Sequence, residues 1–325
     1  MTTRLFAALI AAPLLLAQPA MAQDQCPAFR WTTLGTAGGP IPTLDRAEPA
    51  NLLEAGGRTI LVDSGDAAAT QLARLGRSIG TIDTVFISHL HWDHTGGLAA
   101  VLGLRWMNNF ETPITVYGPP GTAAVVDGII ASLRPQERVG FGTGARVADP
   151  AANITVYELA DGEGVTIDAM RVTARINTHY DFTEEQVGTT SLSYRFDMGG
   201  RSITYSGDSG PSTALTELAQ GSDLLVSEVM ALEPIMASIL AMRPDMPPPV
   251  QAAMRQHMST HHIEAVDVGR MAKAAGVGHL VLTHFAVPPG PLHDSEAYLR
   301  NGVRQTYAGP LDLARDLASY DVGCD

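Results

Sequence analysis

Residues 88–97, with the sequence SHLHWDHTGG, place three histidines and an aspartate within six positions. The segment directly follows an apolar run, so it begins where a strand is expected to end. Residues two apart in an extended chain share a face, which allows His89 and His91 to converge on one ion. The turn that follows directs Asp93 and His94 toward another. The fold must therefore bring the end of a buried strand to a metal site.

The rest of the chain alternates short apolar runs with helical stretches. Strands are expected at residues 30–34, 59–62, 84–88, 114–117, 154–159, 170–176, 190–196, 202–206, 224–226 and 280–283, and helices at 67–75, at 123–133 and from residue 212. We find no internal repeat and no linker. This order predicts one layered α/β domain.

Residues 229–258 differ from the rest of the chain in composition, because they carry six methionines and are interrupted by prolines. The prolines predict two short helices around an elbow that packs near the site. The methionines are interpreted either as core filler or as a deformable apolar wall for substrate.

The N-terminal residues have the pattern of a secretory signal peptide, with an apolar stretch after Arg4 and a cleavage signal that ends at Ala22. Residues 1–22 are therefore expected to be the signal and residues 23–325 a hydrolase domain that is secreted or periplasmic. No later stretch reaches the roughly 18 to 20 apolar residues that cross a bilayer. The two cysteines, Cys26 and Cys324, are expected to form a disulfide that joins the termini, with two free thiols as the alternative.

The HxHxDH pattern resembles the metal-binding motif of the metallo-β-lactamase superfamily, and further motifs follow in the order of that family. They are VDSG at residues 62–65, NTHY at 177–180, YSGDS at 205–209 and VLTHF at 281–285. Residues 34–39 are similar to the opening turn of the ribonuclease Z and zinc arylsulfatase branch. The resemblance covers nearly the whole chain after the signal. It implies an α/β fold, the αββα four-layer sandwich.

The resemblance also implies a ligand set for two ions. One zinc would be held by His89, His91 and His179, and a second by Asp93, His94 and His284, with Asp208 spanning both. Imidazole and carboxylate without thiolate suit a catalytic zinc site, although Mn²⁺ and Fe²⁺ stay open as alternatives. Two close ions lower the pKa of a bridging water from about 16 to near 7, so a metal-bridging hydroxide is the expected nucleophile.

Other residues are expected to support this chemistry. Asp93 would orient the nucleophile as well as bind metal, and Asp63 and Ser88 would hydrogen-bond the histidines, with burial alone as the alternative. Counting back from residues 268–269, His262 matches the histidine of the ribonuclease Z-like branch that stabilises charge over the metals, steadied by Glu228. The alternative for that role is His257, whereas structural or loop positions are expected for His261, His279 and His293.

The charge of the chain shapes the expected substrate. The net charge is −13 and Lys273 is the only lysine, and so acidic a surface repels phosphate backbones. Residues 95–179 hold six arginines and eight acidic residues, so the basic arm with which ribonuclease Z grips tRNA is not expected. We therefore expect an exported dinuclear zinc hydrolase of small sulfate esters or phosphodiesters. Its partner would be a small-molecule ester, with no nucleic acid and no membrane, and a homodimer stays open.

Two alternatives use the same residues differently. A lactonase or β-lactamase-type hydrolase would direct the same nucleophile at a cyclic ester or amide. Asp208, Glu228 and His262 argue against a true β-lactamase, because these positions belong to the phosphodiesterase-like branch. The other alternative is a non-catalytic exported metal-binding protein, in which the metal is retained for stability.

Overall fold

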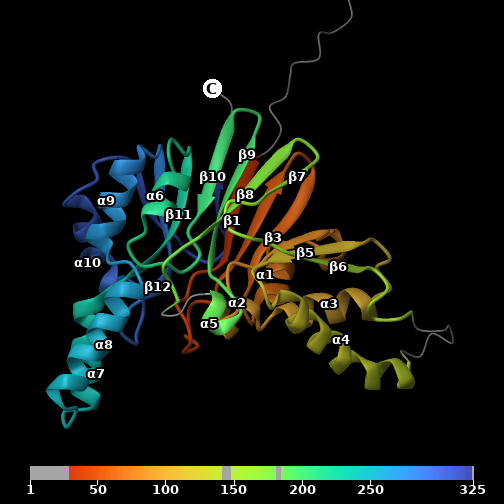
Figure 1. The fold of residues 1–325 in the computed structure, drawn as a ribbon, viewed down its shortest axis with the longest axis horizontal. Coiled ribbons are helices and arrows are strands. Elements are labelled where there is room, and N and C mark those ends of the chain that lie inside the picture. The colour runs from red at the N-terminus through yellow and green to blue at the C-terminus, as the bar shows by residue number, and fades with distance from the viewer. Residues whose placement is uncertain (1–28, 141–147, 181–183, 324–325) are drawn as a thin grey trace, which may run out of the picture.

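The computed structural model describes residues 29–140, 148–180 and 184–323, in which two seven-stranded sheets pack face to face (Figure 1). The first sheet has the spatial order β14 (Ala318–Asp321), β1 (Phe29–Gly35), β2 (Ala50–Ala55), β3 (Arg58–Ser64), β4 (Thr84–Phe86), β5 (Ile114–Gly118) and β6 (Ile154–Glu158). The second has the order β13 (Leu311–Leu313), β12 (His279–Ala286), β11 (Leu224–Met230), β10 (Arg201–Tyr205), β9 (Leu192–Met198), β8 (Met170–Ile176) and β7 (Gly164–Ile167). In each sheet the four strands at one end, β3 to β6 and β10 to β13, are parallel.

Helices cover the outer face of each sheet (Figure 1). The first sheet packs against α1 (Ala68–Arg74), α3 (Leu98–Met107) and α4 (Thr122–Val139), and the second against α6 (Thr213–Leu218), α9 (Ala265–Ala275) and α10 (His293–Arg304). The short helices are η1 (Ile79–Thr81), α2 (Trp92–Thr95) and α5 (Glu184–Val187). This layer order confirms the predicted αββα four-layer sandwich.

Buried aromatic side chains fill the space between the sheets. The ring of Trp31 lies 6.0 Å from that of Phe196 and 5.4 Å from that of Tyr205, and the ring of Phe86 lies 5.2 Å from that of Tyr194. All five are buried, and such ring pairs add about 0.5–1.5 kcal/mol each to the burial of their area. The two sheets, and the loops at their edges, are therefore held in fixed relation.

Two polar residues lie at bulges inside otherwise regular strands. The pairing of β2 with β3 skips Asp63, and the pairing of β11 with β12 skips His284. Both residues have a positive φ, 57° and 43° respectively, which side chains other than glycine seldom adopt. A bulge re-aims the side chain of its extra residue. Here both bulges turn a polar group toward the same edge of the sandwich.

The methionine-rich segment forms two helices, as predicted. Figure 1 shows α7 (Leu232–Met242) and α8 (Pro248–His261) as a hairpin that projects from the body. Met230 and Met236 are buried with Leu232 near the base of the hairpin. Among the described residues, no methionine lines the pocket over the site described below. The packing therefore favours the core-filler interpretation over an apolar wall for substrate.

Two predictions concern residues beyond the described ranges. The signal peptide of residues 1–22 and the Cys26–Cys324 disulfide lie outside the described residues, and both stay predictions. No helix within the described ranges is both long and apolar enough to span a membrane.

Candidate metal centre

Loops that follow strands of both sheets meet at one edge of the sandwich. The 88–97 segment follows β4, His179 follows β8, Asp208 follows β10, and His284 lies at the β12 bulge. The structure brings all seven expected ligands together, in one group of His89, His91 and His179 and another of Asp93, His94, Asp208 and His284. Within each group the candidate ligand atoms lie within 4.8 Å of one another.

The first group consists of three imidazole rings with facing nitrogens. The Nδ1 atom of His91 lies 3.1 Å from Nε2 of His89 and 3.0 Å from Nε2 of His179. Burial lowers the pKa of His89 well below its usual range and that of His179 to about 3. Neutral imidazole is the form that binds metal. The group can therefore bind one metal ion through three imidazole nitrogens.

The second group is centred on the Asp208 carboxylate. Its Oδ1 lies 3.3 Å from Nε2 of His94 and its Oδ2 lies 3.2 Å from Nε2 of His284. Oδ2 of Asp93 lies 3.6 and 3.5 Å from the same two histidine nitrogens. Oδ2 of Asp208 is also 3.8 Å from Nε2 of His179 in the first group. Asp208 thus lies between the two groups, as a bridging ligand must.

The buried polar atoms of this centre fit metal ions. Nε2 of His94, Oδ1 of Asp208 and both ring nitrogens of His284 are buried without a hydrogen-bond partner. Leaving a buried polar atom unsatisfied costs about 1–3 kcal/mol, and native structures rarely tolerate several in one place. Coordination would satisfy Nε2 of His94, Oδ1 of Asp208 and Nε2 of His284, whereas Nδ1 of His284 faces Glu228, 3.8 Å from its Oε2. The nitrogen and carboxylate donors suit zinc, and also manganese or iron.

Asp63 orients the histidines from behind. Its carboxylate accepts hydrogen bonds from the backbone N–H and the hydroxyl of Ser88, both at 2.7 Å, and from the hydroxyl of Tyr205 at 2.8 Å. Nδ1 of His94 lies 2.7 Å from Oδ2 of Asp63, and the Ser88 hydroxyl lies 3.1 Å from Nδ1 of His89. These are the contacts predicted for Asp63 and Ser88. They leave Nε2 of each histidine to face the centre.

The last turn of α8 orients His179 in the same way. Nδ1 of His179 lies 2.9 Å from the carbonyl oxygen of His261, and Nδ1 of His261 lies 2.9 Å from the carbonyl oxygen of Thr178. His261, expected to be structural, is buried and joins α8 to the ligand loop. Sequence reasoning missed this contact, because a backbone carbonyl leaves no mark on residue type.

His262 and Glu228 form a pair next to the two groups. Nδ1 of His262 lies 2.9 Å from Oε2 of the fully buried Glu228, whose Oε1 accepts the backbone N–H of Ser209. Burial alone would lower the pKa of His262, but the Glu228 carboxylate, helped by Asp208 and Asp93, outweighs it and raises that pKa to about 9. The pairing with Glu228 therefore favours the protonated form of His262. One candidate ligand atom from each of His179, Asp208 and His262 lies within 4.8 Å of the others.

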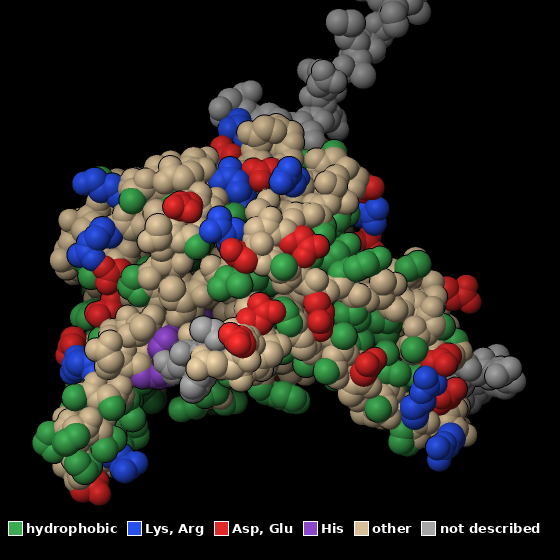
Figure 2. All heavy atoms as spheres, in the orientation of Figure 1, with side chains coloured by type: hydrophobic (Ala, Val, Ile, Leu, Met, Phe, Trp, Pro, Cys, Tyr) green, Lys and Arg blue, Asp and Glu red, His purple; other side chains and the backbone are tan. Residues whose placement is uncertain are grey.

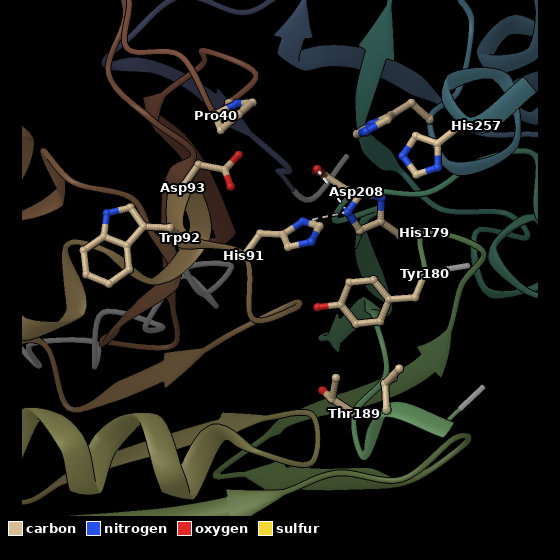
Figure 3. A pocket seen from close by; sticks show the side chains of 12 residues that line it. Pro40, His91, Trp92, Asp93, His179, Tyr180, Thr189, Asp208 and His257 are labelled. Carbon is tan, nitrogen blue, oxygen red and sulfur yellow. Dashed lines mark hydrogen bonds and ion pairs between the residues drawn. The ribbon is translucent and has the colours of Figure 1, made fainter. Parts of the chain in front are cut away.

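A pocket of about 540 Å³ opens over this centre. Figure 3 shows His91 and Asp93 pointing across it toward Asp208 and His179. His257 also lines the pocket, whereas His279 is paired with Asp312 and His293 is an exposed residue of α10. Gly39 and Tyr180 also line the pocket; they belong to the motifs named above but were assigned no role, and Pro40, Trp92, Val187 and Thr189 were not singled out. The sequence signal for Trp92 and Tyr180 is that each adjoins a ligand histidine.

Gly39 supports Asp93 by lacking a side chain. A Cβ atom at this position would lie 2.1 Å from Oδ2 of Asp93, so Gly39→Ala is expected to displace that carboxylate. We expect at least a tenfold loss of metal affinity, the scale on which contacts behind a metal ligand act. Gly128→Ala is the matched control, because a Cβ there meets nothing within 4 Å. Competition with a chromogenic chelator measures both affinities, and equal affinities would contradict the prediction.

Comparisons with known proteins agree with this geometry. A family model described as the beta-lactamase superfamily domain matches residues 58–285. The ribonuclease Z of Mycobacterium avium is 32% identical over 294 residues, covering 90% of this chain and 97% of that protein. The ribonuclease Z of Mycobacterium bovis is 30% identical over 299 residues, with the same coverage.

Solved structures share the fold. The metallo-beta-lactamase fold protein YhfI from Bacillus subtilis has a TM-score of 0.63 at 22% identity and covers 90% of this chain and 99% of its own. The short form of human tRNase Z has a TM-score of 0.62 at 21% identity and covers 91% of this chain and 100% of its own.

These relatives correct two expectations. The expectation of a hydrolase of small sulfate esters or phosphodiesters is wrong, and so is the exclusion of nucleic acid, because relatives matched over 90% of the chain are ribonucleases. Export of the chain stays a prediction. The expectation failed because a net charge of −13 averages over the whole surface. Attraction of a phosphate depends on the local field of the site, and here two candidate metal-binding groups and the His262–Glu228 pair lie in one pocket.

Proposed function

Since this chain belongs to the metallo-β-lactamase superfamily and is a metal-dependent hydrolase of ester bonds, we propose that it cleaves phosphodiester bonds in RNA. The ribonuclease Z relatives, with 97% of their length covered, support RNA as the substrate class. The observation that carries the proposal is the His262–Glu228 pair, which places a histidine held by a buried carboxylate beside two metal-binding groups in one pocket.

We propose two zinc ions as the metals. His89, His91 and His179 would hold one, Asp93, His94 and His284 the other, and Asp208 both. Metal ions bound there supply Lewis acidity toward a phosphoryl oxygen and activate water. Asp93 reaches the pocket with its carboxylate and would orient the attacking group.

His262 would act on the substrate directly. Its protonated ring faces the pocket, where it donates to a phosphoryl oxygen as negative charge develops, or passes its proton to the leaving oxygen. Glu228 is buried beneath it and acts through it, as a positioning residue. The proton that His262 would donate to the substrate is the one on Nε2, because the proton on Nδ1 is hydrogen-bonded to Glu228.

The test is cleavage of a panel of folded and unfolded RNA transcripts by zinc-loaded protein, beside an aryl sulfate ester. We expect metal-dependent RNA cleavage that stops on chelation and returns with zinc, and no sulfate release. The variant Asp208→Asn, purified in parallel, excludes a contaminating ribonuclease. Intact RNA after incubation with fully metal-loaded protein would refute the proposal.

A further inference from the structure

The mouth of the pocket is poor in cations for a nucleic-acid site. None of the described residues that line it is lysine or arginine, and its only basic side chains are histidines. Figure 2 shows histidine side chains on the same face as α5, with acidic side chains close by. The first turn of α5 carries Glu184 and Glu185, both exposed. The phosphates next to the scissile one therefore meet no lysine or arginine in the described lining of the pocket. We infer that the flanking nucleotides are held mainly by a contact other than an ion pair.

Trp92 supplies an exposed aromatic surface at this mouth. It is 77% exposed although it is the largest apolar side chain of the rim, and no buried cluster includes it. Its neighbours in the chain are His91 and Asp93, two of the proposed ligands, so metal binding would fix its backbone on both sides. In Figure 3 its indole is directed away from Asp208, while His91 and Asp93 are directed toward it. The ring is thus an exposed part of the pocket lining that lies to the side of the candidate ligands.

Tyr180 provides a second ring at the other side of His91. Its hydroxyl accepts the backbone N–H of Leu90 at 3.0 Å, and its ring centre lies 5.4 Å from that of His91. Figure 3 places it across the pocket from Trp92. Two aromatic rings, each adjacent in sequence to a ligand histidine, therefore flank the metal centre. Aromatic platforms of this kind bind unpaired bases, with about 1–3 kcal/mol per stacked base.

Resting on the proposed function, we propose that Trp92 stacks against the base next to the scissile phosphate, so that this nucleotide must be unpaired. Stacking then replaces the basic contacts that the mouth lacks. Stacking contacts the flat π-face of a base, and all four bases have such a face. The protein is therefore expected to select unpaired nucleotides and not a particular sequence. Binding of the flanking nucleotide is accordingly expected to depend weakly on salt.

The experiment uses the zinc-loaded full chain and two RNA substrates that differ only in whether the nucleotide beside the cleaved bond carries a base. We expect the wild type to lose about 5- to 150-fold in kcat/KM on the abasic substrate, the scale of one stacked base. The variant Trp92→Ala should show the same loss on the intact substrate and no further loss on the abasic one, whereas Trp92→Phe should keep most of the activity. Tyr157→Ala, an exposed aromatic of β6 outside the pocket lining, should behave as the wild type.

Metal content, measured on each sample, separates loss of stacking from loss of the centre. Equal cleavage of the two substrates by the wild type would overturn the stacking proposal, and so would an unchanged kcat/KM of fully metallated Trp92→Ala on the intact substrate. A log–log salt slope of kcat/KM steeper than about −2 would also overturn it, because it would show that several phosphates are bound by cations. In each of these cases RNA cleavage itself, and with it the proposed function, stands. Absence of any RNA cleavage would remove both.

Discussion

Asp208→Asn is expected to release metal from both groups and to reduce RNA cleavage by at least about 100-fold. Contacts behind a ligand already cost about 10- to 100-fold, and Asp208 is placed as a ligand itself. Its two oxygens lie 3.3 and 3.2 Å from nitrogens of His94 and His284, and one also faces His179. The amide keeps the shape of the side chain but removes the charge that two cations would share. The metal content per chain and kcat/KM are the measurements.

Asp168→Asn is the matched control for that variant. Asp168 forms an exposed ion pair with Arg58, and such pairs contribute about 0–1 kcal/mol to stability. It should leave both metal content and activity unchanged. Full activity of Asp208→Asn with unchanged metal content would show that the carboxylate does not bridge the ions.

Glu228→Gln is expected to shift the alkaline limb of the pH–rate profile to lower pH and to reduce kcat/KM by about 10- to 100-fold, the scale of one lost charge-assisted hydrogen bond. The Glu228 carboxylate raises the pKa of His262 to about 9, against the burial that lowers it. In the wild type the cation is therefore present at neutral pH and is lost as the pH rises through that pKa. Without the carboxylate the largest influence that raises this pKa is gone, so the same loss begins at lower pH.

Comparison with His262→Ala separates a positioning role from a structural one. If Glu228 acts only through His262, the double variant should be no slower than His262→Ala alone. Thermal unfolding of each variant controls for misfolding. A Glu228→Gln enzyme with a wild-type pH profile would show that the pair does not set the protonation of the reacting group.

The metal centre could be predicted from sequence where its residues are local or belong to a motif. The 88–97 segment sets its own geometry, because strand and turn spacing decide which side chains share a face. The distant ligands His179, Asp208 and His284 came from the resemblance, and the structure brings them to that segment. The bulges at Asp63 and His284 were not predicted, since positive φ at such residues is stabilised only by the surrounding structure.

Elements were missed where tertiary contacts override local preference. Strand β2, with the sequence ANLLEA, consists largely of residues that favour helix, and becomes a strand between β1 and β3. Helix α4 was expected to end at Leu133 before Pro135, yet it continues to Val139. The substrate was mispredicted for a related reason, because net charge describes the surface as a whole and not one pocket.

The most direct test of the central claim is a metal titration of apoprotein followed by RNA cleavage on the same samples. We predict that activity rises with added zinc and saturates at two equivalents per chain, since two groups of ligands share Asp208. Each rate would then follow the metal bound, measured by mass spectrometry of the native protein. RNA cleavage at full rate without bound metal, or two bound ions with no cleavage of any RNA, would contradict the account.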